Sequence, residues 1–303
     1  MPCILSRLQG TNLTKDKMQI FEKEKRIIRL QHELFNDHFQ NYKVYNIPKA
    51  QLIIADIPYN VGINAYGSNP SWYIDGDNQN GESKLAGKEF FDTDKDFRIS
   101  EFLHFCSTML KKEPKERGKA PAMVVFCEFE QQFELIEKAK KYGLNNYINL
   151  VFRKNFSAQV LKANMRIVGN SEYAIVLFRD KLPKFNNNGK MVFNVMDWER
   201  DSSMEKIHPT QKPIKVLEKL IKLFTDEGEV VIDPVAGSGS TLLAALNCNR
   251  NAYGFEIKKD FFKAASELLE SKKLEKEEIE KYGWAKTAAS KIHPVFDFGV
   301  IND

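Results

Sequence analysis

Several apolar runs in this chain end in a carboxylate and lead through a loop into an amphipathic stretch. Gln51–Asp56 is one such run, Glu229–Asp233 is a second and Ala252–Glu256 is a third. Continuous apolar runs, rather than alternating ones, are typical of strands that are covered on both faces of a parallel sheet. Alternation of such strands with helices predicts an α/β fold with a mostly parallel sheet.

The remaining segments extend this alternation along most of the chain. Three more strands are predicted at Ala122–Phe126, Tyr147–Phe152 and Tyr173–Phe178. Thr14–Phe39 carries apolar residues among many charges, which predicts one or two amphipathic helices ahead of the first strand. Further helices are predicted over about Ser100–Lys111 with Ser100 as N-cap, near Glu130–Lys141, from Pro213 to about Phe224, from the turn after Asp233 to about Asn247, and beyond Lys258.

The composition is that of an ordinary globular protein. The apolar share of 43% rises to roughly 48% when the 16 glycines are added, which is within the usual range. No run approaches the ~18–20 apolar residues of a transmembrane helix, and Lys15–Arg29 lacks the apolar core of a signal peptide. We therefore expect a soluble, cytoplasmic protein without a membrane partner. The net charge of +4 is too small to identify a polyanionic partner by itself.

The four cysteines lie far apart in the sequence, and none forms a pair at metal-ligand spacing. A free cysteine is usually buried as a small hydrophobic side chain. The sequence therefore predicts reduced thiols and no metal site. The residues concerned are Cys3, Cys106, Cys127 and Cys248.

Two closely spaced glycines lie in the turn after the strand that ends at Asp233. Gly237 and Gly239 allow the main chain to turn sharply and to approach a ligand without interference from a Cβ atom. Leu242 stands where a dinucleotide fingerprint needs its third glycine, and the lysine of a phosphate-binding loop is absent. Glu256 ends the next strand, where a carboxylate can accept the hydroxyl protons of a ribose. This pattern favours a cationic adenosyl ligand over a phosphate.

The sharpest local signal is the sequence Asp56-Ile-Pro-Tyr-Asn60. It presents an acceptor carboxylate, a backbone stiffened by proline and an aromatic ring together at the carboxyl end of a predicted strand. Ligands of open α/β sheets bind at that edge. The segment therefore predicts a ligand-binding or catalytic loop.

Three segments of the chain together resemble the amino-methylating DNA methyltransferases that act on adenine N6 or cytosine N4. These are Asp56-Ile-Pro-Tyr-Asn60, His208-Pro-Thr-Gln-Lys-Pro213 and Asp233-Pro-Val-Ala-Gly-Ser-Gly-Ser-Thr241, in the order of the permuted β group of that family. The departures from the family pattern are Ile57, Val235 and Ser240. The resemblance implies a Rossmann-like S-adenosylmethionine-dependent methyltransferase fold, with a mostly parallel seven-stranded sheet and helices on both faces.

The resemblance also implies a catalytic loop formed by Asp56, Ile57, Pro58 and Tyr59. Asp56 Oδ and the main-chain carbonyl of Ile57 would accept the two protons of an exocyclic amine and direct its lone pair at the sulfonium methyl of S-adenosylmethionine. Tyr59 would stack on a base flipped out of double-stranded DNA. The cofactor residues implied in the same way are Asp56, Thr210, Lys212, Asp233, Ala236, Gly237, Ser238, Gly239 and Glu256, with His208 only structural.

Candidate DNA contacts are spread along the chain, because only about 27 residues separate the last sheet strand from the His208 segment and a separate domain usually needs ≥50. Tyr59, Asn60, Arg153 and Lys154 are the residues predicted to bind substrate DNA. Weaker candidates for phosphate or groove contacts are Asn64–Asp96, Lys111–Lys119, Lys162, Arg166 and Asn186–Lys190. A homodimer, or a companion restriction or specificity subunit, is the expected means of adding target recognition.

The expected organisation has three parts. Residues 1–45 form an N-terminal helical segment, 46–258 the catalytic domain, and 259–303 a C-terminal helix and tail. The catalytic domain is divided into a catalytic half at 46–180, a short DNA-contact segment at 181–207 and a cofactor half at 208–258.

The predicted reaction is methylation of adenine N6 in DNA, since in this family an aspartate at the position of Asp56 mostly accompanies adenine. Methylation of cytosine N4 stays open. Two other readings also remain: a nicotinamide-dependent oxidoreductase that uses the Gly237 turn, and a non-catalytic DNA-binding subunit.

Overall fold

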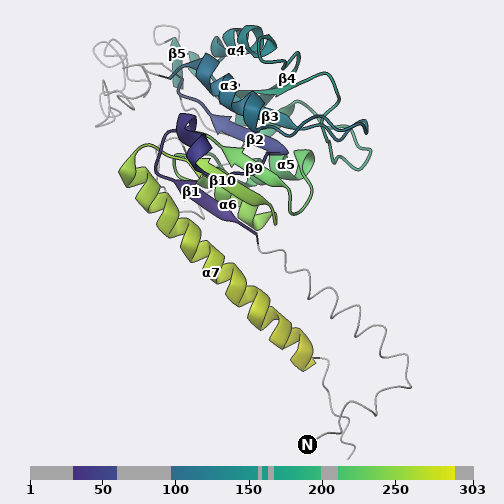
Figure 1. Cartoon of the computed structure of the whole chain (residues 1–303), viewed down its shortest axis with the longest axis vertical. Coiled ribbons are helices and arrows are strands. Elements are labelled where there is room, and N and C mark those ends of the chain that lie inside the picture. Colours follow the sequence, from purple (N-terminus) through teal and green to yellow (C-terminus); the bar gives the residue numbers. More distant parts are fainter. Residues whose placement is uncertain (1–29, 60–96, 156–158, 163–166, 199–210, 291–303) are drawn as a thin grey trace, which may run out of the picture.

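The computed structural model describes residues 30–59, 97–155, 159–162, 167–198 and 211–290. Within these ranges lies an eight-stranded sheet in the order β1-β10-β9-β2-β3-β7-β4-β8 (Figure 1). The strands are β1 (His32–Phe35), β2 (Leu52–Asp56), β3 (Ala122–Cys127), β4 (Asn146–Lys154), β7 (Ser171–Phe178), β8 (Val195–Trp198), β9 (Val230–Asp233) and β10 (Asn251–Phe255).

The sheet is parallel apart from β7, which runs antiparallel to its neighbours β3 and β4. The predicted α/β class and mostly parallel sheet are confirmed, but the sheet has eight strands rather than seven. The two strands missed by the sequence pattern, β1 and β8, have four residues each and lie at the two edges of the sheet. Strands that short do not show a clear periodicity.

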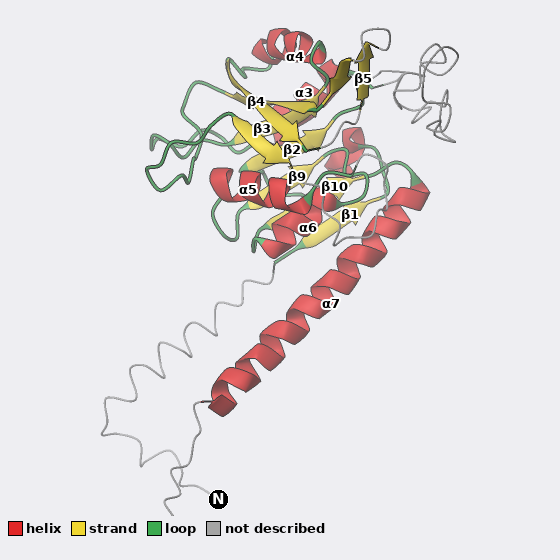
Figure 2. Cartoon of the chain, turned by 180° about the vertical axis from the view of Figure 1, so that it is seen from behind, coloured by secondary structure: helices red, strands yellow, loops and turns green. Residues whose placement is uncertain are grey.

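Helices cover both faces of the sheet, as Figures 1 and 2 show. They are α3 (Ile99–Met109), α4 (Gln131–Lys140), α5 (Ile214–Phe224), α6 (Ser240–Asn247) and α7 (Lys259–Ser290), with a 3-10 helix η1 (Phe39–Val44). Alternate residues of β2 enter two separate cores: Leu52 and Ile54 pack on the side of α5 and α6, whereas Ile53 and Ala55 pack on the side of α3 and α4. Burial on both faces explains the continuous apolar runs.

Some local predictions were wrong. His32–Phe35 is the strand β1, paired in parallel with β10, and not part of an amphipathic helix. The earlier part of that predicted helix lies outside the described residues. Ser100 lies inside α3, whose N-cap is Arg98, and Pro213 is the N-cap of α5 rather than its first residue. The three cysteines of the described ranges are free and buried, as expected, at positions 106, 127 and 248.

Because seven strands share one direction, their carboxyl ends define a single edge of the sheet. We call it the carboxyl edge, and it carries Asp56, Asp233 and Phe255 as the last residues of β2, β9 and β10. The opposite side, where Leu52 and Val230 begin their strands, is the amino edge. The antiparallel β7 begins at the carboxyl edge with Ser171, and a hairpin of β5 (Gln159–Lys162) and β6 (Ile167–Gly169) is inserted there between β4 and β7.

The helix α7 extends well beyond the body of the fold (Figures 1 and 2). Ala265 and Leu269 are buried, whereas Leu274 and Ile279, further along, are exposed. No helix of the described ranges is both long enough and apolar enough to cross a membrane.

Candidate active site

The loop after β2 is fixed against the end of β3. The main-chain N–H of Ile57 donates to the carbonyl of Phe126 at 3.2 Å, and the side chain of Ile57 is buried. The side-chain amide of Gln131 donates to the carbonyl of Pro58 at 2.7 Å and accepts from the N–H of Glu128. The Asp56-Ile-Pro-Tyr59 loop is therefore held in place by the end of β3 and by the first residue of α4.

The carboxylate of Asp56 lies in a buried cluster of charges. Lys212 Nζ is 2.6 Å from Asp56 Oδ2 and 2.6 Å from Glu172 Oε1. The hydroxyl of Tyr59 donates to Glu172 Oε1 at 2.7 Å and lies 3.3 Å from Lys212 Nζ. Glu172 Oε2 also forms an ion pair with Lys154. We call Asp56, Tyr59, Lys154, Glu172 and Lys212 the charge cluster; its two carboxylates balance its two ammonium groups.

Aromatic rings surround the ammonium group of Lys212. Its Nζ lies 5.4 Å from the ring centroid of Tyr59, 5.3 Å from that of Phe126 and 5.6 Å from that of Trp198. Only 8% of the Lys212 side chain is exposed. Ring faces attract cations within about 6 Å, so this environment partly offsets the cost of burying the charge.

Burial and charge pairing act in opposite directions on the pKa values in the charge cluster. Burial raises the pKa of Asp56 above its ordinary value, against the pull of Lys212. Burial also acts to raise the pKa of Glu172, but the ammonium groups of Lys212 and Lys154 outweigh it and hold that pKa at about 2. For Lys212, burial alone would lower the pKa, whereas Asp56 and Glu172 raise it. Glu172 and Lys212 are therefore charged at neutral pH.

One acceptor of the charge cluster has no partner within the described residues. Asp56 Oδ1 is buried and makes no hydrogen bond there, although Oδ2 of the same carboxylate is held by Lys212. A buried polar atom without a partner costs free energy, and such atoms are few in native proteins. The arrangement is suited to accept a hydrogen bond from a ligand donor next to the ring of Tyr59.

The glycine turn follows β9 at the same edge of the sheet. Gly237 and Gly239 have φ angles of 52° and 73°, which residues with a side chain adopt only with strain. The N–H of Gly237 donates to Glu256 Oε2 at 2.9 Å, and the N–H of Lys258 donates to Glu256 Oε1 at 2.7 Å. The carboxylate at the end of β10 thus holds the turn, and each of its oxygens retains a lone pair.

Asp233 is buried at the end of β9 and accepts from the N–H of Val235 at 3.0 Å. Burial raises the pKa of Asp233 to about 7, and the charges of Asp56 and Glu256 act in the same direction. Strands β9 and β2 pair directly in parallel, with Leu52 opposite Val231. The Asp56–Tyr59 loop and the glycine turn therefore lie at the same edge of the sheet, on neighbouring strands.

The structure brings together most of the residues that the sequence singled out. Asn60, Thr210 and His208 lie outside the described residues, as do Asn64–Asp96 and Arg166. At the carboxyl edge it places Asp56, Ile57, Pro58, Tyr59, Lys212, Asp233, Ala236, Gly237, Ser238, Gly239 and Glu256.

Two of the predicted DNA contacts differ in their surroundings. The side chain of Lys154 is only 13% exposed and belongs to the charge cluster, so in this conformation it does not face a phosphate. Arg153 is 65% exposed and pairs with the equally exposed Asp197 at 2.6 Å. Exposed pairs of this kind contribute little and exchange partners readily. Arg153 thus stays a candidate for a phosphate contact.

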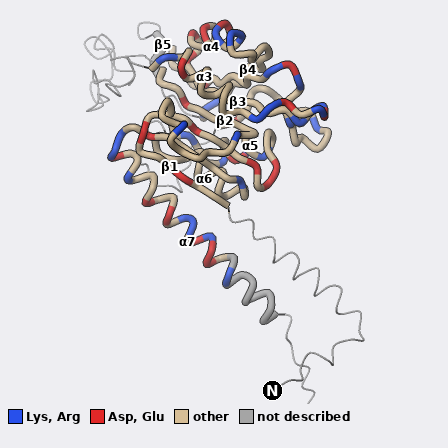
Figure 3. The backbone as a smooth tube through the Cα atoms, in the orientation of Figure 1, with Lys and Arg blue, Asp and Glu red and all other residues tan. Residues whose placement is uncertain are grey.

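Two basic segments that the sequence offered as weaker DNA contacts lie at the amino edge, opposite the Asp56–Tyr59 loop and the glycine turn. Lys111–Lys119 leads into the start of β3, and Asn186–Lys190 follows the end of the antiparallel β7, so both lie at the amino edge. A strand of five residues separates the two edges by roughly 17 Å. Lys and Arg are spread over α4, α7 and several loops, with Asp and Glu between them (Figure 3).

Sequence reasoning missed Glu172 and Gln131, together with the aromatic rings of Phe126 and Trp198. Glu172 is the second residue of β7, and it reaches the site only because that strand runs antiparallel. Trp198 ends β8, which was not predicted as a strand. A glutamate at the start of an otherwise apolar run was the one available signal, since an acidic residue there is costly unless it has partners.

Comparisons with known proteins agree with this geometry. The putative methylase YubD of Escherichia coli (strain K12) is 30% identical over 151 residues, which cover 50% of this chain and 63% of YubD. The DNA adenine methyltransferase YhdJ of the same organism is 28% identical over 145 residues, which cover 47% of this chain and 45% of YhdJ. The chain thus spans about half the length of these relatives.

Among solved structures, the M1.HpyAVI–SAM complex shares the fold. It has a TM-score of 0.55 at 20% identity and covers 78% of this chain and 99% of that one. Residues 50–267 match the family described as DNA methylase, and this range contains the Asp56–Tyr59 loop, the charge cluster and the glycine turn. The chain therefore belongs to the DNA methylase family.

Proposed function

We propose that this protein transfers a methyl group from S-adenosylmethionine to the exocyclic N6 amine of adenine in DNA. The observation that carries the proposal is the carboxylate of Asp56. Its Oδ1 lacks a partner among the described residues and lies in the same cluster as Tyr59, at the sheet edge that also carries the glycine turn. Membership of the DNA methylase family supports the same reaction class.

The residues around the glycine turn suit an adenosyl cofactor. Gly237 and Gly239 leave the main chain accessible, and Glu256 retains acceptor capacity for the hydroxyls of a ribose. The carboxyl group of Asp233, with a pKa of about 7, would be drawn to its ionised form by a cation bound nearby. Thr210 keeps the role that the resemblance gives it. When bound, S-adenosylmethionine would supply a methyl group activated by its sulfonium.

We propose a different task for Lys212 from the one that the sequence suggested. The resemblance placed it near the carboxylate of the cofactor, but an ammonium group has three donors. In the structure these are directed to Asp56, Glu172 and Tyr59. We therefore propose that Lys212 holds the catalytic carboxylate instead of the cofactor.

The catalytic loop would act by positioning rather than by strong base chemistry. The lone pair of an exocyclic amine is delocalised into the ring, so the nitrogen is a poor nucleophile until its protons are held by acceptors. Asp56 Oδ1 and the carbonyl of Ile57 would accept these two protons, while the ring of Tyr59 stacks on the flipped base. The amine nitrogen would take the methyl group as its bond to the sulfonium sulfur breaks, which leaves a neutral thioether, and Asp56 would pass the proton that the nitrogen then loses to solvent.

Adenine is the proposed base for two reasons. The residue at position 56 is an aspartate, and the relative YhdJ is named a DNA adenine methyltransferase. The substrate in the proposal is double-stranded DNA, with Arg153 and Asn60 near the duplex. A homodimer, or a companion restriction or specificity subunit, would supply the remaining recognition.

The test is to incubate the purified protein with unmethylated genomic DNA and S-adenosylmethionine, and to analyse the hydrolysed nucleosides by mass spectrometry. N6-methyladenine is the expected product. N4-methylcytosine would overturn the choice of base and leave the reaction class intact. The absence of both products, together with thermal protection by NAD instead of S-adenosylhomocysteine, would support an oxidoreductase. DNA binding without product would support a non-catalytic subunit.

A further inference from the structure

Glu172 contacts as many members of the charge cluster as Lys212 does, although the sequence did not single it out. Its side chain is 8% exposed, and it contacts three residues from three other segments of the chain. Oε1 lies 2.6 Å from Lys212 Nζ and accepts from the Tyr59 hydroxyl at 2.7 Å, while Oε2 pairs with Lys154. Glu172 itself makes no ion pair or hydrogen bond with Asp56 among the contacts of the described residues.

The fold places Glu172 at this point for a topological reason. Strand β7 is antiparallel to β3 and β4, so its first residues lie beside the last residues of those strands. Glu172 is opposite Phe152, and two and four residues further along Ala174 and Val176 enter the same core as Phe126 and Phe152. The side chain therefore points to the face of the sheet on which Lys212 and Trp198 lie.

The charge balance shows what Glu172 does for Lys212. A buried ammonium group is costly unless it is paired and hydrogen-bonded. Asp56 and Glu172 flank Lys212 at equal distances of 2.6 Å. Without Glu172, Lys212 would be free to move toward both oxygens of Asp56, and the hydroxyl of Tyr59 would lose its acceptor.

We propose that Glu172 is a positioning residue of the methyltransferase site: it anchors Lys212 and Tyr59, so that Lys212 binds only Oδ2 of Asp56 and Oδ1 stays available for the base amine. This inference rests on the proposed function, because it assigns Oδ1 to the amine. Glu172 touches neither substrate nor cofactor in this scheme and acts through its two partners.

The structure offers a matched control at the amino edge. Glu229 is also a largely buried glutamate between two lysines, with Lys111 and Lys184 each at 3.0 Å. Substitution of either glutamate by glutamine removes one buried negative charge between two ammonium groups. Only Glu172 is linked to Asp56 through a shared lysine, so the pair Glu172→Gln and Glu229→Gln separates positioning from general stability.

The experiment compares the wild type with Glu172→Gln, Glu172→Asp and Glu229→Gln. It measures kcat for methylation of DNA and, by calorimetry, the Kd of S-adenosylmethionine. We expect Glu172→Gln to lower kcat at least tenfold with Kd within threefold of the wild type. Glu172→Asp keeps the charge and should lose less, and Glu229→Gln should keep kcat within twofold.

Three results would overturn the inference: kcat of Glu172→Gln within twofold of the wild type, a parallel loss of cofactor affinity, or an equal loss of kcat in Glu229→Gln. If Glu172→Gln does not fold, as judged by circular dichroism, Tyr59→Phe takes its place. This variant removes only the hydroxyl that Glu172 holds, so a kcat lowered threefold or more supports the anchoring role and an unchanged kcat contradicts it. A wild type that transfers no methyl group overturns the proposed function as well, whereas an active wild type beside an equally active Glu172→Gln overturns only this inference.

Discussion

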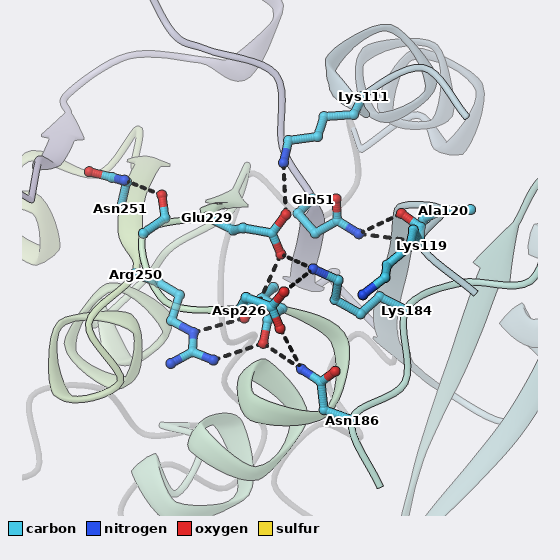
Figure 4. A network of polar contacts seen from close by, with 12 residues as sticks. Gln51, Lys111, Lys119, Ala120, Lys184, Asn186, Asp226, Glu229, Arg250 and Asn251 are labelled. Atoms are coloured by element: carbon cyan, nitrogen blue, oxygen red, sulfur yellow. Dashed lines mark hydrogen bonds and ion pairs between the residues drawn. The ribbon is translucent and has the colours of Figure 1, made fainter. Parts of the chain in front are cut away.

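The two edges of the sheet each carry a network of charges around a buried lysine, and the networks are built from similar residue types. At the carboxyl edge Lys212 lies between Asp56 and Glu172. At the amino edge Lys184 lies between Asp226 and Glu229 (Figure 4). Residue types alone would not distinguish the two places.

They differ in how completely their polar groups are paired. Glu229 accepts from Lys111, Lys184 and the N–H of Asp226, and Asn186 donates to Asp226 (Figure 4). At the carboxyl edge Asp56 Oδ1 has no partner within the described ranges, and three aromatic rings surround the lysine. A network whose polar groups are all paired stabilises the fold. A buried acceptor without a partner lowers the stability of the free protein, and such acceptors are expected at sites that bind a ligand.

The substitution Asp56→Ala should have the largest effect and tests the catalytic role proposed for the carboxyl edge. We expect kcat to fall by roughly 100- to 1,000-fold or more, because the amine loses a preorganised acceptor. The Kd of S-adenosylmethionine should stay within a few-fold, since the side chain acts on the base. Single-turnover methylation and calorimetry measure the two quantities. Equal losses of both would show that Asp56 serves the cofactor.

The second substitution, Tyr59→Ala, tests the aromatic part of the carboxyl edge. Loss of stacking should weaken binding of substrate DNA by about 1–3 kcal/mol. A fluorescence anisotropy titration in fixed salt, with S-adenosylhomocysteine present, measures the affinity. Binding of DNA that lacks the target base serves as the control and should change little. An unaltered affinity for the target DNA would exclude stacking.

At the amino edge, Glu229→Gln should affect stability instead of rate. The carboxylate loses its charge-assisted hydrogen bonds to two lysines, which we expect to lower the free energy of unfolding by about 1–3 kcal/mol. Urea denaturation followed by circular dichroism measures the change. A variant as stable as the wild type would show that this network contributes nothing to the fold.

The last prediction concerns pH. The pKa of Asp233 is raised to about 7 by burial, so the group is largely protonated below that pH. A bound cation favours the ionised form, and affinity for S-adenosylmethionine should therefore fall by up to about tenfold per pH unit below pH 7. Titrations of the wild type and of Asp233→Asn at pH 5.5 to 8 test this.

The comparison with Asp233→Asn is needed because the amino group of the cofactor titrates at about pH 8. That contribution is common to both proteins and cancels. The folding stability of the free protein depends on pH in the opposite direction to the affinity for the cofactor. Because the pKa of Asp233 is raised by folding, its contribution to the free energy of unfolding is fully present below pH 4 and is lost as the pH rises through 7. A pH dependence that persists unchanged in Asp233→Asn would contradict the assignment.

Much of the sheet could be predicted because its strands are buried on both faces. β2, β3, β4, β7, β9 and β10 all match predicted apolar runs to within a few residues. Short edge strands could not be predicted, since four residues with one exposed side leave little pattern. The segment 181–207, which the sequence suggested as a short DNA-contact segment, also contains a short strand that was not predicted. It begins at the amino edge and includes β8, whose Met196 and Trp198 are buried in the core.

The sequence by itself determined that Asp56 and the Gly237–Gly239 turn face the same ligand side, because the carboxyl ends of parallel strands always share an edge. It also carried the motifs that identify the family. The tertiary structure decided which side chains complete the site. Glu172 and Lys154 join Asp56 and Lys212 only through the antiparallel direction of β7 and its place between β3 and β4. Strand order and direction depend on pairing between distant segments, and the local periodicity of a sequence does not contain that information.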